Sequence, residues 1–110
     1  IIMYKPLPNS VTIKPSKING LGLFATQLIK KNTDLGMTHL IIAYWPHPVT
    51  KQNEVIRTPL GGFINHSEES NCVRLEVTET RWNLKTIKEI KKGEELTLKY
   101  TLYNPKDKND

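Results

Sequence analysis

Cysteine is almost absent from this sequence: Cys72 is the single one among 110 residues. One thiol cannot form an intrachain disulfide, and it cannot supply a cysteine-rich zinc cluster within one chain. The three histidines, His39, His47 and His66, are scattered without the spacing that metal ligands show. We therefore predict no metal site.

Long apolar runs are missing as well. The longest, residues 40–45, has six residues, against the roughly 20 that a membrane-spanning helix needs. The sequence does not start with the charged-then-apolar pattern of a secretory signal. We accordingly expect an intracellular protein, cytoplasmic, in a host nucleus or viral, that is not secreted and has no membrane partner.

Arginine is scarce although the net charge is +5. Among 16 basic residues only Arg57, Arg74 and Arg81 carry a guanidinium, and the lysines are spread along the chain. This distribution predicts a solvated basic surface that favours acidic partners. Nucleic acid is not expected as a direct substrate.

No stretch has a sustained helical period, whereas several short stretches alternate between apolar and polar residues. Val73, Leu75 and Val77 alternate with polar residues, which predicts one buried and one exposed face, and residues 82–87 can complete a hairpin with them. Further strands are expected within residues 11–14, 21–25, 35–44, 55–58 and 96–100. These patterns predict a mainly β single domain over residues 1–110, with a lead-in at 1–10 and a flexible tail at 104–110.

Two segments echo each other, residues 28–35 and residues 89–96. Asn32 and Gly93 occupy matching places, and both residue types tolerate the left-handed backbone conformation that ends a helical turn. The echo predicts two similar turns, each leading into a strand.

Residues 61–67, with Asn71 just beyond them, have the composition of a site. Two glycines precede Phe63 and Ile64, and three hydrogen-bonding side chains follow in a row, ending at Ser67. By itself the segment fits a tight connection whose Asn and Ser bond to their own backbone, and turn statistics favour that reading. The rest of the chain favours a functional site.

Three blocks occur in order along the chain: Asn-Gly-Leu-Gly-Leu-Phe-Ala at 19–25, Gly-Phe-Ile-Asn-His-Ser at 62–67, and Gly-Glu-Glu-Leu-Thr-Leu-Lys-Tyr at 93–100. Over residues 11–103 this series resembles the SET domain family, the lysine methyltransferases that use S-adenosylmethionine, in the compact stand-alone form carried by viruses. The resemblance implies a SET-type β-clip of several small twisted sheets with a C-terminal pseudoknot. In that fold the last strand threads the loop formed by residues 61–67.

The resemblance also implies roles for single residues. The expected cofactor-binding residues are Gly20, Leu21, Gly22, Asn65 and His66. The expected catalytic residue is Tyr100, which would line the methyl-transfer pore, and the expected walls of the substrate channel are Phe63 and Tyr103.

The implied function is methyl transfer from S-adenosylmethionine to a lysine side chain of a protein or peptide substrate. Desolvation in an aromatic channel lowers the pKa of a lysine amine, so no strong general base is required. This agrees with a sequence that contains no Ser-His-Asp or paired-carboxylate constellation. The alternative is a non-catalytic SET-like module that binds a partner protein or an anionic surface.

The chain departs from the family pattern at Lys99, where many members have Asp, and at Glu68, where many have a second cysteine. Alternation along a strand predicts that Lys99 faces away from Tyr100. The segment that builds one wall of the peptide groove spans only residues 36–60 here. The groove is therefore either shallow or completed by a partner chain, which leaves a homodimer open.

Overall fold

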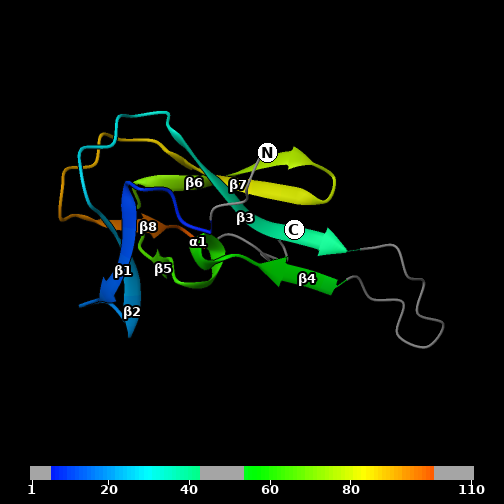
Figure 1. Cartoon of the computed structure of the whole chain (residues 1–110), viewed down its shortest axis with the longest axis horizontal. Helices are drawn as coiled ribbons and strands as arrows, with labels where there is room; N and C mark the ends of the chain where they lie inside the picture. Colours follow the sequence, from blue (N-terminus) through cyan, green and yellow to red (C-terminus); the bar gives the residue numbers. More distant parts are fainter. Residues whose placement is uncertain (1–5, 43–53, 101–110) are drawn as a thin grey trace.

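The computed structural model describes residues 6–42 and 54–100 of the chain (Figure 1). The elements in order are β1 (Val11–Pro15), β2 (Leu21–Ala25), β3 (Asp34–Ile42), β4 (Glu54–Arg57), α1 (Pro59–Gly62), β5 (Asn65–His66), β6 (Cys72–Thr78), β7 (Arg81–Thr86) and β8 (Glu95–Leu98). The fold is mainly β, as the alternating patterns predicted. Nothing helical in the described ranges has the length and apolar character of a membrane span.

One curled sheet contains all eight strands. Its order is β1-β2-β8-β6-β7-β3-β4, and β5 pairs with β8 beside this path. In Figure 1, β1 and β2 stand across one end of the molecule, while the β6–β7 hairpin and the β3–β4 pair extend toward the other. The C-terminal strand β8 joins the two parts, because it pairs antiparallel with β2 and parallel with β5 and β6.

The threading that the resemblance implied follows from the pairing of one residue. Leu98 of β8 has two strand partners, His66 in β5 and Cys72 in β6. A strand residue has one neighbour at each edge, so residues 67–71 must cross over β8 to connect the two partners. The crossing therefore follows the expected loop of residues 61–67 and shares only Ser67 with it. The Ser67 N–H donates to the Leu98 carbonyl at 3.1 Å from this crossing. The C-terminal pseudoknot is thus present, an exception to the usual unthreaded connections.

Asn71 fastens the crossing loop to β8 with its side chain. Its Nδ2 donates to the Glu95 carbonyl at 2.9 Å, and its Oδ1 accepts the Thr97 N–H at 2.8 Å. One side-chain amide therefore satisfies two backbone groups that a neighbouring strand would otherwise have to pair. The loop is held at the level of Leu96, between these two bonds.

The core lies where the two parts of the curled sheet meet. Its buried apolar members are Val11, Leu23, Ala25, Ile29, Leu35, Leu60, Ile64, Cys72, Leu84, Ile90, Leu96 and Leu98. The Cys72 side chain has no exposed surface. Burial raises the pKa of its thiol to about 12, which makes it a poor nucleophile and a poor metal ligand at neutral pH.

The two echoing segments form two turns that pair with each other. Ile29 and Ile90 make an antiparallel bridge in which each N–H donates to the other's carbonyl at 2.8 Å. Asn32 has φ 67° and Gly93 has φ 90°, so both residues adopt the left-handed conformation. The predicted matching turns are confirmed.

The predicted hairpin of β6 and β7 is confirmed, but the predicted buried face of β6 is wrong. Val73, Leu75 and Val77 are exposed by 36%, 41% and 47%. Cys72 is buried because β6 pairs with β8 at that end, whereas the rest of the strand continues into the hairpin beyond the core (Figure 1). Pro46 and Pro48 in the sequence predict an exposed loop at residues 45–54, and this segment lies almost wholly outside the described residues.

Candidate active site

The first predicted block forms the turn and strand that approach β8. Gly20 ends the turn after β1 with φ 48°, a conformation that glycine adopts without strain. Gly22 is buried in β2, and a Cβ atom there would collide with the Glu95 carboxylate and lie 3.1 Å from Asn65 Nδ2. The missing side chain at Gly22 therefore lets the first block come next to the second and third.

Asn65 joins these blocks through its side-chain amide. The side chain is almost fully buried, and Nδ2 lies within hydrogen-bond distance of four acceptors: Ser16 Oγ (3.0 Å), Asn19 O (3.1 Å), Leu21 O (3.3 Å) and Glu95 Oε2 (2.9 Å). The Ser16 hydroxyl is also 2.9 Å from both Glu95 oxygens. Asn65 thus holds the β1–β2 turn against β8.

The hydrogen-bond partners of Asn65 distinguish it from a residue that only stabilises its own turn. Ser67 does bond to its own backbone, since its Oγ accepts the Glu69 N–H at 3.1 Å. The partners of Asn65, in contrast, lie 30 to 49 residues away along the chain. The simple-turn reading therefore holds for Ser67 and fails for Asn65.

His66 directs its ring toward Tyr100. Nδ1 accepts the Tyr100 backbone N–H at 2.9 Å, and the two rings lie 5.0 Å apart between centroids. Nε2 lies 3.0 Å from Glu68 Oε2. In this arrangement Nδ1 carries no proton and Nε2 donates to the carboxylate. The His66 ring therefore positions the expected catalytic residue.

The two departures from the family pattern are partners of each other. Lys99 Nζ lies 3.3 Å from Glu68 Oε1, on the exposed side of the site. The hydrogen bonds that Glu68 receives from His66 and Lys99 lower the pKa of its carboxyl group. Both departures are visible in the sequence, but only the structure shows that the two residues form an ion pair.

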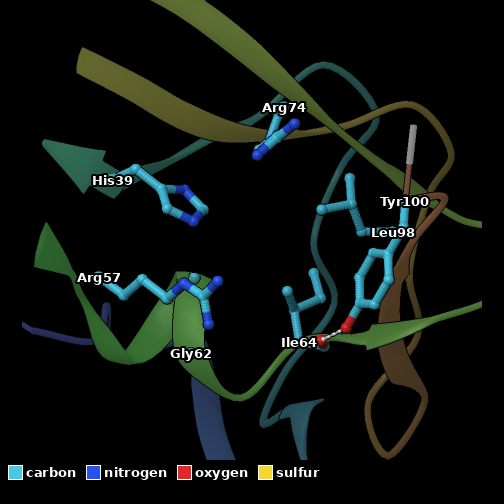
Figure 2. A pocket seen from close by; sticks show the side chains of 8 residues that line it. His39, Arg57, Gly62, Ile64, Arg74, Leu98 and Tyr100 are labelled. Atoms are coloured by element: carbon cyan, nitrogen blue, oxygen red, sulfur yellow. Dashed lines mark hydrogen bonds between the residues drawn. The ribbon is translucent and has the colours of Figure 1, made fainter. Parts of the chain in front are cut away.

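Tyr100 borders a pocket of about 250 Å³ (Figure 2). Its hydroxyl donates to the Ile64 carbonyl at 2.6 Å. The lining residues are His39, Arg57, Gly61, Gly62, Ile64, Arg74, Leu98 and Tyr100. Of the expected channel walls, Phe63 is 38% exposed and is not among these lining residues, and Tyr103 lies outside the described residues.

The opposite side of the pocket is cationic. His39, Arg57 and Arg74 point into it from β3, β4 and β6 (Figure 2). Burial lowers the pKa of His39, and the charges of Arg74 and Arg57 lower it further. In the sequence, His39 shows no metal-ligand spacing and both arginines are counted with the solvated basic surface, so no pattern marked these three residues as a group. Alternation on three short strands was the available signal, but it does not say which strands pair.

The chain can now be compared with known proteins. A family model of the SET domain matches residues 44–101, which is more than half of the chain. The chain belongs to the SET domain family. No curated protein has a matching sequence.

Two solved structures resemble this SET domain. One is a Plasmodium falciparum protein assigned as a histone methyltransferase, with a TM-score of 0.66 and 20% identity, covering 88% of this chain and 97% of the other. The second is the methyltransferase domain of human PR domain-containing protein 2, with a TM-score of 0.64 and 22% identity, covering 89% of this chain and 81% of the other. At these identities the likeness shows the shared fold.

Family membership supports methyl transfer as the general class of reaction for this SET domain. Within residues 6–42 and 54–100, the histidines, Cys72 and the acidic residues form no group of three that could hold a metal ion.

Proposed function

We propose that this SET domain transfers a methyl group from S-adenosylmethionine to a lysine side chain of a protein, and that Tyr100 and the Ile64 carbonyl line the transfer pore. The observation that carries the proposal is the 2.6 Å hydrogen bond between the Tyr100 hydroxyl and the Ile64 carbonyl. Ile64 directly precedes Asn65 and His66, so one peptide connects the pocket that holds Tyr100 to the expected cofactor residues.

The residues around Asn65 fit the amino end of the cofactor. The two Nδ2 hydrogens of Asn65 are shared among four nearby acceptors, but Oδ1 accepts no hydrogen bond from the part of the chain that the structure describes. Buried amide oxygens are usually satisfied, so this one suits a ligand N–H or ammonium group. Gly20, Leu21 and Gly22 would lie along the same group with their backbone, and His66 would contribute mainly through its main chain.

The pocket suits the accepting amine. When bound, S-adenosylmethionine supplies an electrophilic methyl group on a sulfonium sulfur. A lysine amine can attack it only after losing the proton that it holds with a pKa of about 10.4 in water. The apolar walls formed by Ile64 and Leu98 disfavour the charged ammonium, and the proton leaves to solvent through the open pocket. The Tyr100 hydroxyl and the Ile64 carbonyl then orient the neutral amine.

The first test measures cofactor binding and the role of Tyr100 together. Titration calorimetry with S-adenosylmethionine should show binding to the wild type and to Tyr100→Phe alike. Methyl transfer from radiolabelled cofactor to a protein lysate should fall roughly a hundredfold in Tyr100→Phe, or change in the number of methyl groups added, because one preorganised dipole is lost.

A matched control removes a hydroxyl elsewhere. Thr12→Val does so in β1, away from the residues that line the pocket, and should leave transfer unchanged. Unaltered kinetics in Tyr100→Phe would remove Tyr100 from the pore. No heat with millimolar cofactor would sink the enzyme proposal and favour a non-catalytic SET module.

A further inference from the structure

Two arginines in the Tyr100 pocket, Arg57 and Arg74, have no anionic partner among residues 6–42 and 54–100. Both ion pairs within the described residues belong to Glu68, and neither involves Arg57 or Arg74. Glu76 lies two residues after Arg74 in β6, yet the pair is not within ion-pair distance. Arg74 is half-buried, and its pKa is lowered by that burial and by the charge of Arg57. Like charges brought together in a partly desolvated place are unfavourable unless an anion joins them.

The strand register brings His39 and Arg57 to one face of the sheet. His39 in β3 pairs with Arg57 in β4 on one side and with Trp82 in β7 on the other. Trp82 in turn pairs with Glu76 in β6. Directly paired residues point to the same face of a sheet, so this row crosses four strands on the face of the pocket, and its one carboxylate, Glu76, lines neither the pocket nor the hollow beside it. Arg74 enters from β6 across the pocket, as Figure 2 shows.

The pocket also continues along this face. A second hollow of about 610 Å³ shares His39, Arg57 and Arg74 with the first. Its other lining residues are Ile41, Val55 and Trp82. The two together form a groove that runs from Tyr100, past the cationic cluster, to an apolar end. We call it the Tyr100 groove.

We propose that His39, Arg57 and Arg74 form a subsite for one anionic group, a carboxylate or a phosphate, carried by the protein substrate beside its target lysine. This inference rests on the proposed function and adds a substrate class to it. A lysine that approaches two unpaired arginines is repelled, and an anionic group on the same peptide reverses that repulsion while pairing with the guanidinium forks.

The surroundings favour a peptide over nucleic acid. Nucleic-acid binding relies on many phosphate contacts along an extended basic track. In the Tyr100 groove, two arginines lie between the pocket at Tyr100 and the apolar end. This order suits a peptide whose lysine enters the pocket, whose acidic group binds the arginines and whose apolar side chain packs at the far end.

The experiment uses the full chain and a lysine-centred peptide library in which one flanking position carries Glu, phosphoserine, Gln or Lys. Peptide binding is measured by fluorescence anisotropy, and methyl transfer is measured in parallel. The wild type should prefer one placement of Glu or phosphoserine over Gln by roughly tenfold, as for a charge-assisted hydrogen bond. Arg57→Gln and Arg74→Gln should each lose most of this preference. A larger preference for phosphoserine than for Glu identifies phosphate as the group.

Arg81→Gln is the matched control, since it removes the same charge from the third arginine, which does not line the groove. It should keep the acidic preference. Arg57→Glu should invert the preference toward a Lys at the same peptide position, a result that loss of folding cannot produce. His39 ring resonances should shift when the preferred peptide is added.

The two proposals fail in different ways. Acidic preference in binding without any methyl transfer would defeat the proposed function and leave the subsite standing. Transfer or binding with no acidic preference, or a preference retained in Arg57→Gln and Arg74→Gln, would overturn the subsite. A DNA duplex that displaces every peptide and depends on the same two arginines would also overturn it.

Discussion

Asn65 and His66 use their side chains mainly to hold backbone. The Asn65 amide binds the carbonyls of the β1–β2 turn, and His66 Nδ1 accepts the Tyr100 N–H. The resemblance to SET domains marked both residues as members of the expected site, because they belong to the second of its three blocks. It could not supply their partners, which come from segments 30 to 49 residues distant.

Also at the residue scale, the pKa of His39 should depend on the nearby charges of Arg57 and Arg74. Burial first, and then Arg74 and Arg57, lower its pKa below the usual 6.5. The neutral ring is therefore favoured in the folded state. Its contribution to the free energy of unfolding is present above the unfolded pKa and is lost as pH falls through the lowered folded pKa. An NMR titration of the His39 ring should give a value below 6.5, and Arg57→Gln should raise it.

Arg81→Gln serves again as the control and should leave that titration unchanged. Urea unfolding at neutral and acidic pH should show a smaller acid loss in His39→Gln than in the wild type. A wild-type His39 that titrates at or above 6.5 would show that the neighbouring arginines do not act on it.

At the scale of elements, the pseudoknot decides where Tyr100 lies. The β5 strand and the 67–71 crossing hold β8 from both edges, and Tyr100 follows β8 by two residues. The family resemblance implied this threading. The alternating pattern of β8 alone predicts a strand and cannot say that the strand is enclosed, because its neighbours are set by long-range pairing.

The Asn71 side chain ties the crossing loop to β8, so its removal should destabilise the pseudoknot. Asn71→Ala leaves the Thr97 N–H and the Glu95 carbonyl unpaired in a partly buried place, which costs about 1–3 kcal/mol. Urea denaturation should show a lower midpoint with an unchanged slope. Asn71→Asp keeps the acceptor for the Thr97 N–H but sets a carboxylate oxygen against the Glu95 carbonyl, so it should be destabilised as well. Equal stability of Asn71→Ala and the wild type would contradict this role.

At the scale of the molecule, Cys72 lies at the junction of the curled sheet. It pairs with Thr86 on one side and Leu98 on the other, and its side chain is fully buried. Burial raises the pKa of its thiol to about 12. In the folded chain the thiol is therefore neither reached by a reagent nor ionised to the reactive thiolate.

Labelling of Cys72 should therefore require opening of the whole domain. The rate of reaction with an aromatic disulfide reagent should rise with urea along the same slope as global unfolding. Asn71→Ala should speed labelling in proportion to its loss of stability. Fast labelling of the folded wild type, independent of urea, would mean that the β6–β8 junction opens locally.

The exposed apolar side chains of β6 show that an alternating pattern predicts a strand but not which of its faces the rest of the molecule covers. Alternation of Val73, Leu75 and Val77 correctly predicted a strand, because side chains in a strand point alternately to two faces. It wrongly predicted that their face is buried. Whether a face is covered depends on which element packs over it, and β6 meets β8 only at Cys72.

The sequence by itself determined the class of fold, the strands, the two matching turns and the three blocks whose order resembles a SET domain. These features depend on local conformational preference and on motif order, both of which are written along the chain. The tertiary structure decided that β8 is enclosed, that Glu68 and Lys99 form an ion pair, and that His39, Arg57 and Arg74 meet in the Tyr100 groove. Those features depend on strand pairing between distant segments, and neither period nor composition encodes which strands pair.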